Sequence, residues 1–449
     1  MPGAGPATPA GLDGAHLKLG RARLAGLGRG PGLVHLRHSA ARGRVPAAGC
    51  AGGRCTGHAL LLEQSGTVPR PPRGLAGQCP ARLRRGENPA GAAGRRHRCA
   101  ALPQRPGVAP VAAVTDRPVR LRRNRDNRHI RELTRAVRLH REQFIQPLFV
   151  VEGLAAREAV PGLRDVYRET PASLLRQIES DLESGISKFL LFGVPGTRVE
   201  PTRDLFISHT FTSARLADIR SRFGDAVWVA ADVCLCSYTT HGHCGILTDS
   251  RDHVDNDVTV AALARAALEF AHAGADCIAP SDMQDGRVAA IRASLDGAGF
   301  ERRALMSYAA KFHSAFYGPF RVAANSAPDR ANTLKDRASY QIDPGRPDDA
   351  LLAARRDAAE GADILMVKPG LPYLDVLARL SAAIPLPWAV YQTSGEQAGI
   401  DVLAAQNLAD PVRAQLETWT AFARAGAQMI ISYAARRAAL YLDQQGTQE

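Results

Sequence analysis

Eight short apolar runs separated by helix-like stretches are the feature that most constrains the fold of this chain. The runs are Phe144–Val151, Lys188–Gly193, Val227–Cys234, Asp276–Asp282, Ala304–Ala309, Ile364–Gly370, Trp388–Ser394 and Met429–Ala434. The stretches Val258–Ala273, Gly286–Leu295 and Asp348–Ala359 carry apolar residues three and four positions apart. Apolar strands alternating with amphipathic helices are typical of a parallel sheet covered by helices. Eight such units over about 320 residues predict an α/β fold, a closed (β/α)8 TIM barrel, with a doubly wound open sheet as the alternative.

In such a barrel, chemistry is carried by residues at the C-terminal ends of the strands. Most of the runs have a polar residue at or just beyond that end. These residues are Cys234, Ser281, Asp282, Lys368, Ser394 and Tyr433, with Lys311 just past the fifth run. We therefore expect them to converge on one mouth of the barrel.

The first 113 residues differ from the rest of the chain in composition. They are rich in Gly, Ala, Pro and Arg, with 17 Lys or Arg and only three acids, whereas the remainder carries 40 basic and 41 acidic residues. Such a segment buries too little apolar surface to offset its ordering entropy, so residues 1–113 are predicted to be a disordered basic extension. A transit peptide, a start codon placed too early and a nucleic-acid-binding tail are the alternatives. The nearly neutral remainder predicts no nucleic-acid partner.

The apolar content also bears on the compartment. No run of 18 or more apolar residues exists, which predicts no membrane-spanning helix. The N-terminus lacks a charged start followed by an apolar core, so we expect no secretion. Three clustered cysteines without an export signal are typical of a metal site in a reducing compartment. These features predict a cytoplasmic protein.

The three clustered cysteines predict a metal site. Cys234, Cys236 and Cys244 lie within DVCLCSYTTHGHCGIL. Three thiolates suit zinc and leave a coordination position for water or substrate, which is typical of a catalytic zinc. Alternatively, His241 or His243 is a fourth ligand and the zinc is structural, or the cysteines bind no metal.

Two lysines are candidate nucleophiles. Lys311 lies in MSYAAKFHSAFYGPFR and Lys368 in ILMVKPG. A lysine at the end of a buried strand is costly unless it is paired or neutral, and two adjacent lysines lower each other's pKa. A neutral amine is what Schiff-base attack on a ketone requires. Paired structural lysines are the alternative. Asp232 lies on the strand that leads to the cysteines, where we expect its carboxylate to orient a metal-bound water or a substrate amine. The alternative is a salt bridge between Asp232 and a neighbouring residue.

A long segment, Phe312–Pro347, follows the fifth strand. Segments of this length are usually lids or binding loops. Its polar side chains include Arg321, Lys335, Arg337 and Gln341. An arginine cluster on a mobile loop suits a substrate carboxylate. Ser394 and Tyr433 offer hydroxyls for a second carboxylate, although each of these residues alone is also an ordinary capped or solvated loop residue.

Together these segments resemble the porphobilinogen synthases, also called 5-aminolevulinate dehydratases. The resemblance spans roughly residues 117–440. It rests on the cysteine segment, the two lysine segments and the stretches RPVRLRRNRDNRHIRELTRAVRL, FIQPLFVVEG, VDND, GADCIAPSDMQDGRVAAIR, DRASYQIDP and YQTSGE. It implies a homo-oligomer, usually an octamer, in which residues 114–142 are an N-terminal oligomerisation arm and residues 143–449 are the catalytic barrel.

The resemblance also implies a reaction. A hydro-lyase of the zinc-dependent type condenses two molecules of 5-aminolevulinate into porphobilinogen, with loss of two waters, in tetrapyrrole (haem) biosynthesis. By matching position, Lys368 forms the Schiff base with the first substrate and Lys311 serves the second. Cys234, Cys236 and Cys244 hold the zinc that polarises the second substrate's carbonyl.

Further roles are implied by matching position. Arg321, Arg337 and Gln341 bind the carboxylate of the second substrate, and Ser394 and Tyr433 bind that of the first. The residues implied near the substrate amine are Asp232, Ser281 and Tyr317.

The chain departs from the family pattern at several positions. The differences are residues 196–213, His313, the Gln after SGE, QNLAD at 406–410, and Ala358. Ala358 lies in a helix region where many bacterial members place a carboxylate for an allosteric magnesium, which argues against that magnesium here. Both lysines and all three cysteines are intact. The competing interpretations are a diverged paralogue that condenses another amino ketone and a non-catalytic zinc-binding oligomer.

Overall fold

The computed structural model describes residues 120–202, 207–329 and 333–448. The predicted extension 1–113 and the first six residues of the predicted arm lie outside this part of the chain. Eight parallel strands form one closed barrel in chain order, with β10 pairing back to β1. They are β1 (Phe144–Val151), β4 (Lys188–Val194), β5 (Trp228–Val233), β6 (Cys277–Pro280), β7 (Ala304–Lys311), β8 (Ile364–Lys368), β9 (Trp388–Tyr391) and β10 (Met429–Ile431). This closure confirms the predicted (β/α)8 barrel and rules out the open sheet.

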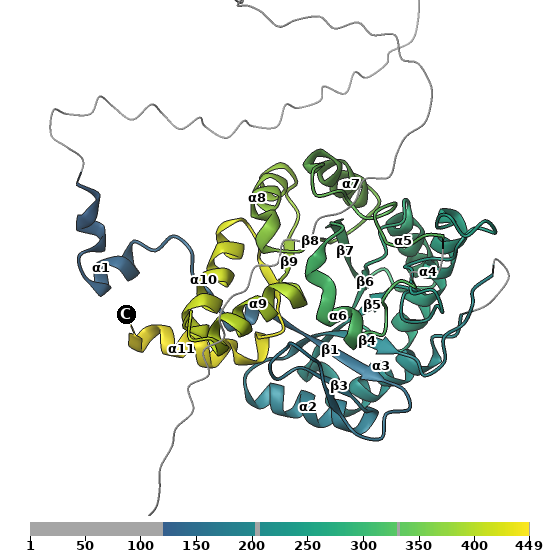
Figure 1. The fold of residues 1–449 in the computed structure, drawn as a ribbon, viewed down its shortest axis with the longest axis horizontal. Helices are drawn as coiled ribbons and strands as arrows, with labels where there is room; N and C mark the ends of the chain where they lie inside the picture. Colours follow the sequence, from purple (N-terminus) through teal and green to yellow (C-terminus); the bar gives the residue numbers. More distant parts are fainter. Residues whose placement is uncertain (1–119, 203–206, 330–332, 449) are drawn as a thin grey trace, which may run out of the picture. The chain divides into compact units, whose positions relative to one another are not determined.

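Helices lie around the strands (Figure 1). Those of the barrel are α2 (Pro171–Glu183), α3 (Thr210–Phe223), α4 (Asn256–His272), α5 (Arg287–Gly297), α7 (Pro347–Ala359), α8 (Leu374–Ala383), α9 (Ser394–Ala405), α10 (Pro411–Arg424) and α11 (Ala438–Gln448). The three helices predicted from apolar spacing correspond to α4, α5 and α7. No helix in the described ranges has both the length and the apolar character needed to cross a bilayer.

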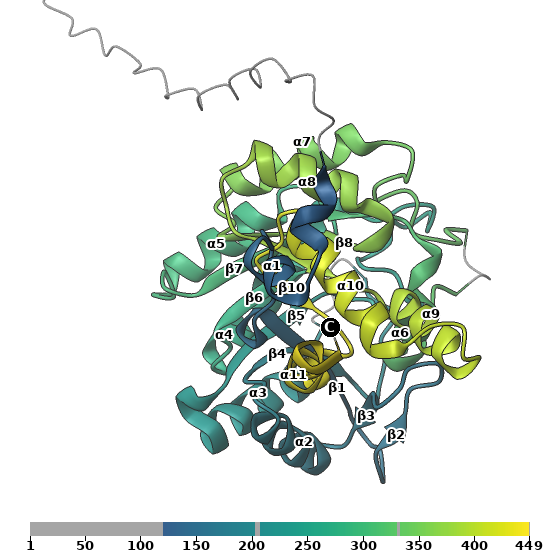
Figure 2. The same ribbon diagram turned by 90° about the vertical axis from the view of Figure 1, so that its left-hand side faces the viewer.

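Short elements complete the chain, and Figure 2 shows several of them from the side. They are α1 (Arg128–Leu133), α6 (Gly318–Ala323), β2 (Glu158–Ala159), β3 (Tyr167–Glu169) and the 3₁₀ helices η1 (Leu121–Arg125), η2 (Arg141–Gln143), η3 (Gly224–Ala226), η4 (Ala315–Tyr317), η5 (Leu371–Tyr373) and η6 (Ala435–Arg437). The strands β2 and β3 were not predicted. The second half of β1 pairs with β3, whereas its first two residues pair with β10. Neither η1 nor α1 has a buried residue.

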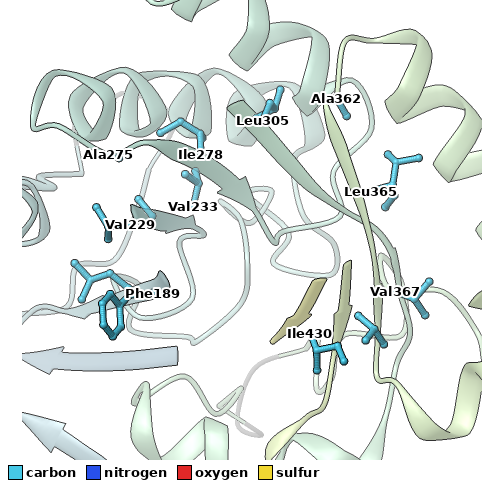
Figure 3. Close-up of a cluster of buried hydrophobic side chains, with 14 of the residues drawn as sticks. Phe189, Val229, Val233, Ala275, Ile278, Leu305, Ala362, Leu365, Val367 and Ile430 are labelled. Carbon is cyan, nitrogen blue, oxygen red and sulfur yellow. The ribbon is translucent and has the colours of Figure 1, made fainter. Parts of the chain in front are cut away.

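The strands are buried on both faces, as expected for a parallel barrel. One apolar cluster lies between the strands and the helices and includes Phe189, Val229, Ile278 and Leu365 (Figure 3). A second cluster collects side chains from the opposite face of the strands. Its aromatic members include Phe149, Phe192, Tyr308, Tyr391 and Tyr433. Side chains alternate along a strand, so continuous apolar runs supply both clusters.

Candidate active site

Lys311 and Lys368 are the last residues of two adjacent strands, β7 and β8, and they are partners in the parallel ladder. Their exposed fractions are only 5% and 3%. The prediction that both lysines reach one mouth is therefore correct. The prediction that Lys311 falls beyond the fifth strand is wrong, because β7 continues through it.

A β-bulge precedes Lys311. The pairing passes from Ser307–Leu365 to Ala310–Val367, so β7 advances by three residues while β8 advances by two. One extra residue in a strand reverses the face on which the following side chains lie. This extra residue is what allows Lys311 to share the barrel interior with a side chain three positions earlier in β7.

That earlier side chain is Tyr308, which was not predicted to belong to the site. Its ring centroid lies 5.7 Å from the Lys311 Nζ and 5.1 Å from the Lys368 Nζ. Its hydroxyl is buried and has no hydrogen-bond partner among the described residues. Tyr308 therefore faces both amines, a position that only the bulge produces.

Lys368 lies among aromatic rings, and its Nζ is 3.8 Å from the ring centroid of Tyr391. Burial lowers the pKa of Lys368 to about 7, with a further lowering by Lys311 and an opposing effect of Asp232. A large fraction of this amine is therefore neutral at neutral pH. Unprotonated nitrogen is the form that attacks a carbonyl carbon.

Asp232 and Ser281 lie beside the two amines. The Lys311 Nζ donates a hydrogen bond to the backbone carbonyl of Ser281. Burial raises the pKa of Asp232 to about 6, although Lys311, Lys368 and the Ser281 hydroxyl each favour the ionised carboxylate. The structure thus brings these two predicted residues together with both lysines.

The three cysteines form one buried group. Their Sγ atoms all lie within 4.8 Å of one another. The Sγ atoms of Cys234 and Cys236 are 3.3 Å apart, and the two residues form no disulfide. Hydrogen bonds from Cys234 and Cys236 lower the pKa of the Cys244 thiol well below its usual range, against the effect of burial. Three converging soft donors, one of them readily ionised, fit a thiophilic divalent cation.

The two neighbouring histidines have other partners. Both ring nitrogens of His243 are engaged, Nδ1 with the Tyr340 hydroxyl (3.1 Å) and Nε2 with the Leu334 carbonyl (2.9 Å). The His241 Nδ1 accepts the backbone N–H of His243. Within the described ranges, the three thiols alone make up the metal-binding group.

Arg321, Arg337 and Gln341 form a polar group with unused hydrogen-bonding capacity. Arg337 donates through Nη2 to the carbonyls of Gly242 (2.9 Å) and Ser326 (2.6 Å). Its Nε, the Arg321 Nε and both amide atoms of Gln341 are buried and have no partner among the described residues. Burial and the adjacent Arg337 lower the pKa of Arg321. A carboxylate ligand would accept hydrogen bonds from these unpaired donors beside the two guanidinium groups.

The two predicted hydroxyls, on Ser394 and Tyr433, are both buried. The Ser394 Oγ accepts the backbone N–H of Phe320 at 3.0 Å, and the Tyr391 hydroxyl donates to that of Tyr433 at 3.2 Å. Ser394 lies at the start of α9 rather than at a strand end, because β9 stops at Tyr391.

The predicted lid contains two further residues singled out from the sequence. The Tyr317 hydroxyl donates to the Phe312 carbonyl at 2.8 Å, and its ring centroid lies 5.6 Å from the Lys368 Nζ. Tyr317 therefore packs against the site rather than offering a free hydroxyl. Lys335, in contrast, is exposed. The lid returns to the barrel where Phe312 bridges to Ile342.

Glu396 was not predicted to belong to the site, yet it organises the loop that follows Lys368. Its buried carboxylate accepts the backbone N–H groups of Gly370, Leu371 and Thr393. The sequence carries a signal for part of this arrangement, since a threonine followed three residues later by glutamate is a capping box.

Comparison with known proteins places these residues in a family. Residues 118–441 match the family model described as delta-aminolevulinic acid dehydratase. The delta-aminolevulinic acid dehydratase of Bacillus subtilis is 40% identical over 323 residues, which cover 72% of this chain and 98% of that protein. The protein of the same name from Methanothermobacter thermautotrophicus is 43% identical over 317 residues, covering 70% and 94%.

A solved structure gives the same result. The delta-aminolevulinic acid dehydratase (porphobilinogen synthase) of Toxoplasma gondii, in complex with its product porphobilinogen, is 36% identical and superposes with a TM-score of 0.69. The match covers 74% of this chain and 95% of that one. The family model, the relatives and the superposition together show that the chain belongs to the delta-aminolevulinic acid dehydratase family.

Proposed function

We propose that this chain is a porphobilinogen synthase, a lyase that joins two molecules of 5-aminolevulinate into one porphobilinogen and releases two waters. The observation that carries this proposal is the pairing of two buried amines, Lys311 and Lys368, at the ends of neighbouring strands. Condensing two identical amino ketones requires two carbonyl groups to be activated in one cavity. Family membership and the product named in the T. gondii complex support the same reaction.

Lys368 is the nucleophile that binds the first substrate. Its neutral amine adds to the ketone carbon, a C–N bond forms, and the ketone oxygen leaves as water to give a Schiff base. The pKa of about 7 keeps enough of this amine unprotonated for attack at neutral pH. The surrounding rings, including Tyr391, exclude water from the adduct.

Lys311 engages the second substrate in the same way. Its Nζ is oriented by the Ser281 carbonyl. Asp232, with a pKa of about 6 and close to both amines, is suited to accept and return protons during the condensation. The Tyr308 ring lies close to both amines.

A zinc ion held by Cys234, Cys236 and Cys244 is part of the proposal. Three thiolates with no fourth protein ligand among the residues that the structure describes suit zinc with one position left open. When bound, zinc supplies Lewis-acid polarisation of a carbonyl oxygen. Negative charge on Cys234 and Cys236 favours the protonated form of Lys368 and raises its pKa, against the larger lowering by burial and by Lys311.

Each substrate carries a carboxylate, and the site offers two places to bind one. Arg321, Arg337 and Gln341 bind the carboxylate of the second substrate through their unused donors. Ser394 and Tyr433 bind that of the first through their hydroxyls. Clamps of this kind hold the two ketones in position for reaction.

The assembly and location are also proposals. We infer a homo-oligomer, an octamer as in the family, in which residues 114–142 form an arm that contacts a neighbouring subunit and residues 143–449 form the barrel. The arm helices bury no residue of their own, and Leu121 and Leu133 in them are 62% and 76% exposed. All four cysteines in the described part of the chain are free and buried, which supports a reducing compartment, the cytoplasm.

The test is release of porphobilinogen from 5-aminolevulinate by the purified chain supplied with zinc. We expect product in the ratio of one porphobilinogen to two substrates consumed. A Lys368→Met variant, which keeps a side chain of similar length but no amine, should release none. Absence of product from the unchanged chain with zinc bound would contradict the proposed function.

A further inference from the structure

Four side chains beneath the mouth form a buried ionic cluster that the reaction above does not use. The cluster, called the Arg287 cluster here, consists of Asp282 after β6, Arg287 on α5, Ser307 on β7 and Asp357 on α7, all 0% exposed. Arg287 donates through Nη2 to the Asp357 Oδ2 at 2.8 Å and to the Ser307 Oγ at 3.0 Å. The Ser307 hydroxyl in turn donates to the same Asp357 oxygen at 2.6 Å. Four separate segments of the barrel therefore meet at one guanidinium.

Asp282 is the second acidic partner of Arg287. Its Oδ2 lies 3.6 Å from the Arg287 Nε, and its Oδ1 accepts the backbone N–H of Gln284 at 2.7 Å. Asp357 is also contacted by Arg356, at 3.1 Å. Burial raises the pKa of Asp282 to about 6 in spite of Arg287.

Two of the four residues adjoin the groups that set the position of Lys311. Ser307 is the last regularly paired residue before the bulge of β7, after which Lys311 pairs with Lys368. Asp282 directly follows Ser281, whose carbonyl accepts the hydrogen bond from the Lys311 Nζ. Arg287 thus links the strand that carries the amine to the loop that carries its acceptor.

Stability alone does not account for such a cluster. Removing charges from water costs several kcal/mol per ion, and apolar side chains of similar volume often stabilise a buried site as well or better. A buried guanidinium that donates through both of its Nη atoms has another effect, because its planar fork fixes the directions of the groups that accept those hydrogen bonds. The strand around a bulge must be held in one register, because a shift of β7 by one residue would turn Lys311 to the opposite face of the sheet.

We propose that Arg287 is a positioning residue for Lys311: through Ser307, Asp282 and Asp357 it holds the β7 bulge and so keeps the Lys311 amine beside Lys368. Lys368 is on β8, which the Arg287 cluster does not contact through any of the bonds above. The cluster should therefore affect the second amine much more than the first. This inference rests on the proposed function only in assigning the two amines to two substrates.

The test compares two variants with a matched control in the full-length protein. Arg287→Met removes the guanidinium, and Ser307→Ala removes one hydroxyl beside the bulge and disturbs folding far less. The control is Arg220→Met, which breaks another Arg–Asp pair, that of Arg220 with Asp276 (2.5 Å) at the start of β6, the opposite end of the barrel strands. Ser307→Ala keeps the proposal testable if Arg287→Met does not fold.

The readout is the ratio of labelling at the two lysines. Each protein is incubated with 4-oxopentanoate, the substrate without its amino group, reduced with borohydride and mapped by peptide mass spectrometry. We expect labelling of Lys368 to stay within about twofold of the unchanged chain in both variants, while labelling of Lys311 falls about tenfold or more. The kcat for porphobilinogen should fall by up to about 100-fold. Arg220→Met should leave the labelling ratio and kcat unchanged.

Three results would overturn the proposal. They are equal loss of label at Lys311 and Lys368, a labelling ratio in Ser307→Ala identical to that of the unchanged chain, and absence of label at Lys311 in the unchanged chain. The labelling does not require turnover. Failure of the unchanged chain to form porphobilinogen would therefore count against the proposed function and not against this role of Arg287.

Discussion

Lys311 and Lys368 lie directly opposite each other in the ladder between β7 and β8, and one extra residue in β7 is what aligns them. Without that residue, Lys311 and Tyr308 would alternate to opposite faces of the strand. With it, both amines face the same ring and the same carboxylate, Asp232. The charge of Lys311 consequently lowers the pKa of Lys368.

The first prediction concerns pH. The pKa of Lys368 is lowered to about 7, so its reactive neutral form grows as pH rises through 7. The initial rate of adduct formation at Lys368 with 4-oxopentanoate should increase about tenfold between pH 6 and pH 8 and then level off. Asp232 raises this pKa, so Asp232→Asn should move the midpoint to lower pH. A midpoint above pH 9, near that of an exposed lysine, would contradict the account.

The second prediction concerns the metal. The unchanged chain should retain one zinc per chain after dialysis, measured by elemental mass spectrometry, because three thiolates converge on one point. Cys244→Ser should lose it. Cys277→Ala is the matched control, since Cys277 is also a buried free cysteine but lies in β6 outside the group. Equal zinc content in the two variants would argue against the three-thiol site.

The third prediction concerns the substrate carboxylate. Arg321→Met removes a cation whose Nε has no partner among the described residues, so it should raise KM about 10- to 100-fold, the worth of a charge-assisted hydrogen bond. Lys335→Met is the control, because Lys335 is an exposed cation on the same lid. Steady-state kinetics measure both. If Lys335→Met raised KM as much as Arg321→Met, a general electrostatic effect of the lid would be the better explanation.

The fourth prediction concerns the contact between α9 and the lid. A Cβ at Gly395 would lie 2.7 Å from the Cα and 2.8 Å from the carbonyl oxygen of Phe316, so Gly395→Ala must displace η4. Its kcat/KM should fall about tenfold or more. At Gly399, in the same helix, a Cβ meets nothing within 4 Å, and Gly399→Ala should stabilise the chain by about 1 kcal/mol. Identical kinetics for the two variants would show that the contact has no role.

Much of this fold could be predicted because parallel barrel strands are buried on both faces. That burial makes runs such as Val227–Cys234 continuous and apolar, and it leaves their polar ends conspicuous. The resemblance then assigned roles to residues on different strands. Those roles remain proposals, although the structure brings Lys311, Lys368 and the three cysteines to one end of the barrel strands.

What could not be predicted depends on contacts between distant segments. The bulge in β7 is invisible in ALMSYAAK, where alternation alone would put Lys311 and Tyr308 on opposite faces. The strands β2 and β3 are only two and three residues long, too short to show an apolar pattern. Arg287 and Asp357 are separated by 70 residues, and nothing local marks them as buried partners.

The most direct test of the central claim is borohydride reduction in the presence of 5-aminolevulinate, followed by peptide mapping. We expect a reduced adduct on Lys368 first and a second on Lys311 as substrate concentration rises, with none in the double variant Lys311→Met, Lys368→Met. Label confined to exposed lysines, or no label at Lys368 at a pH where the chain is folded and zinc-loaded, would contradict it.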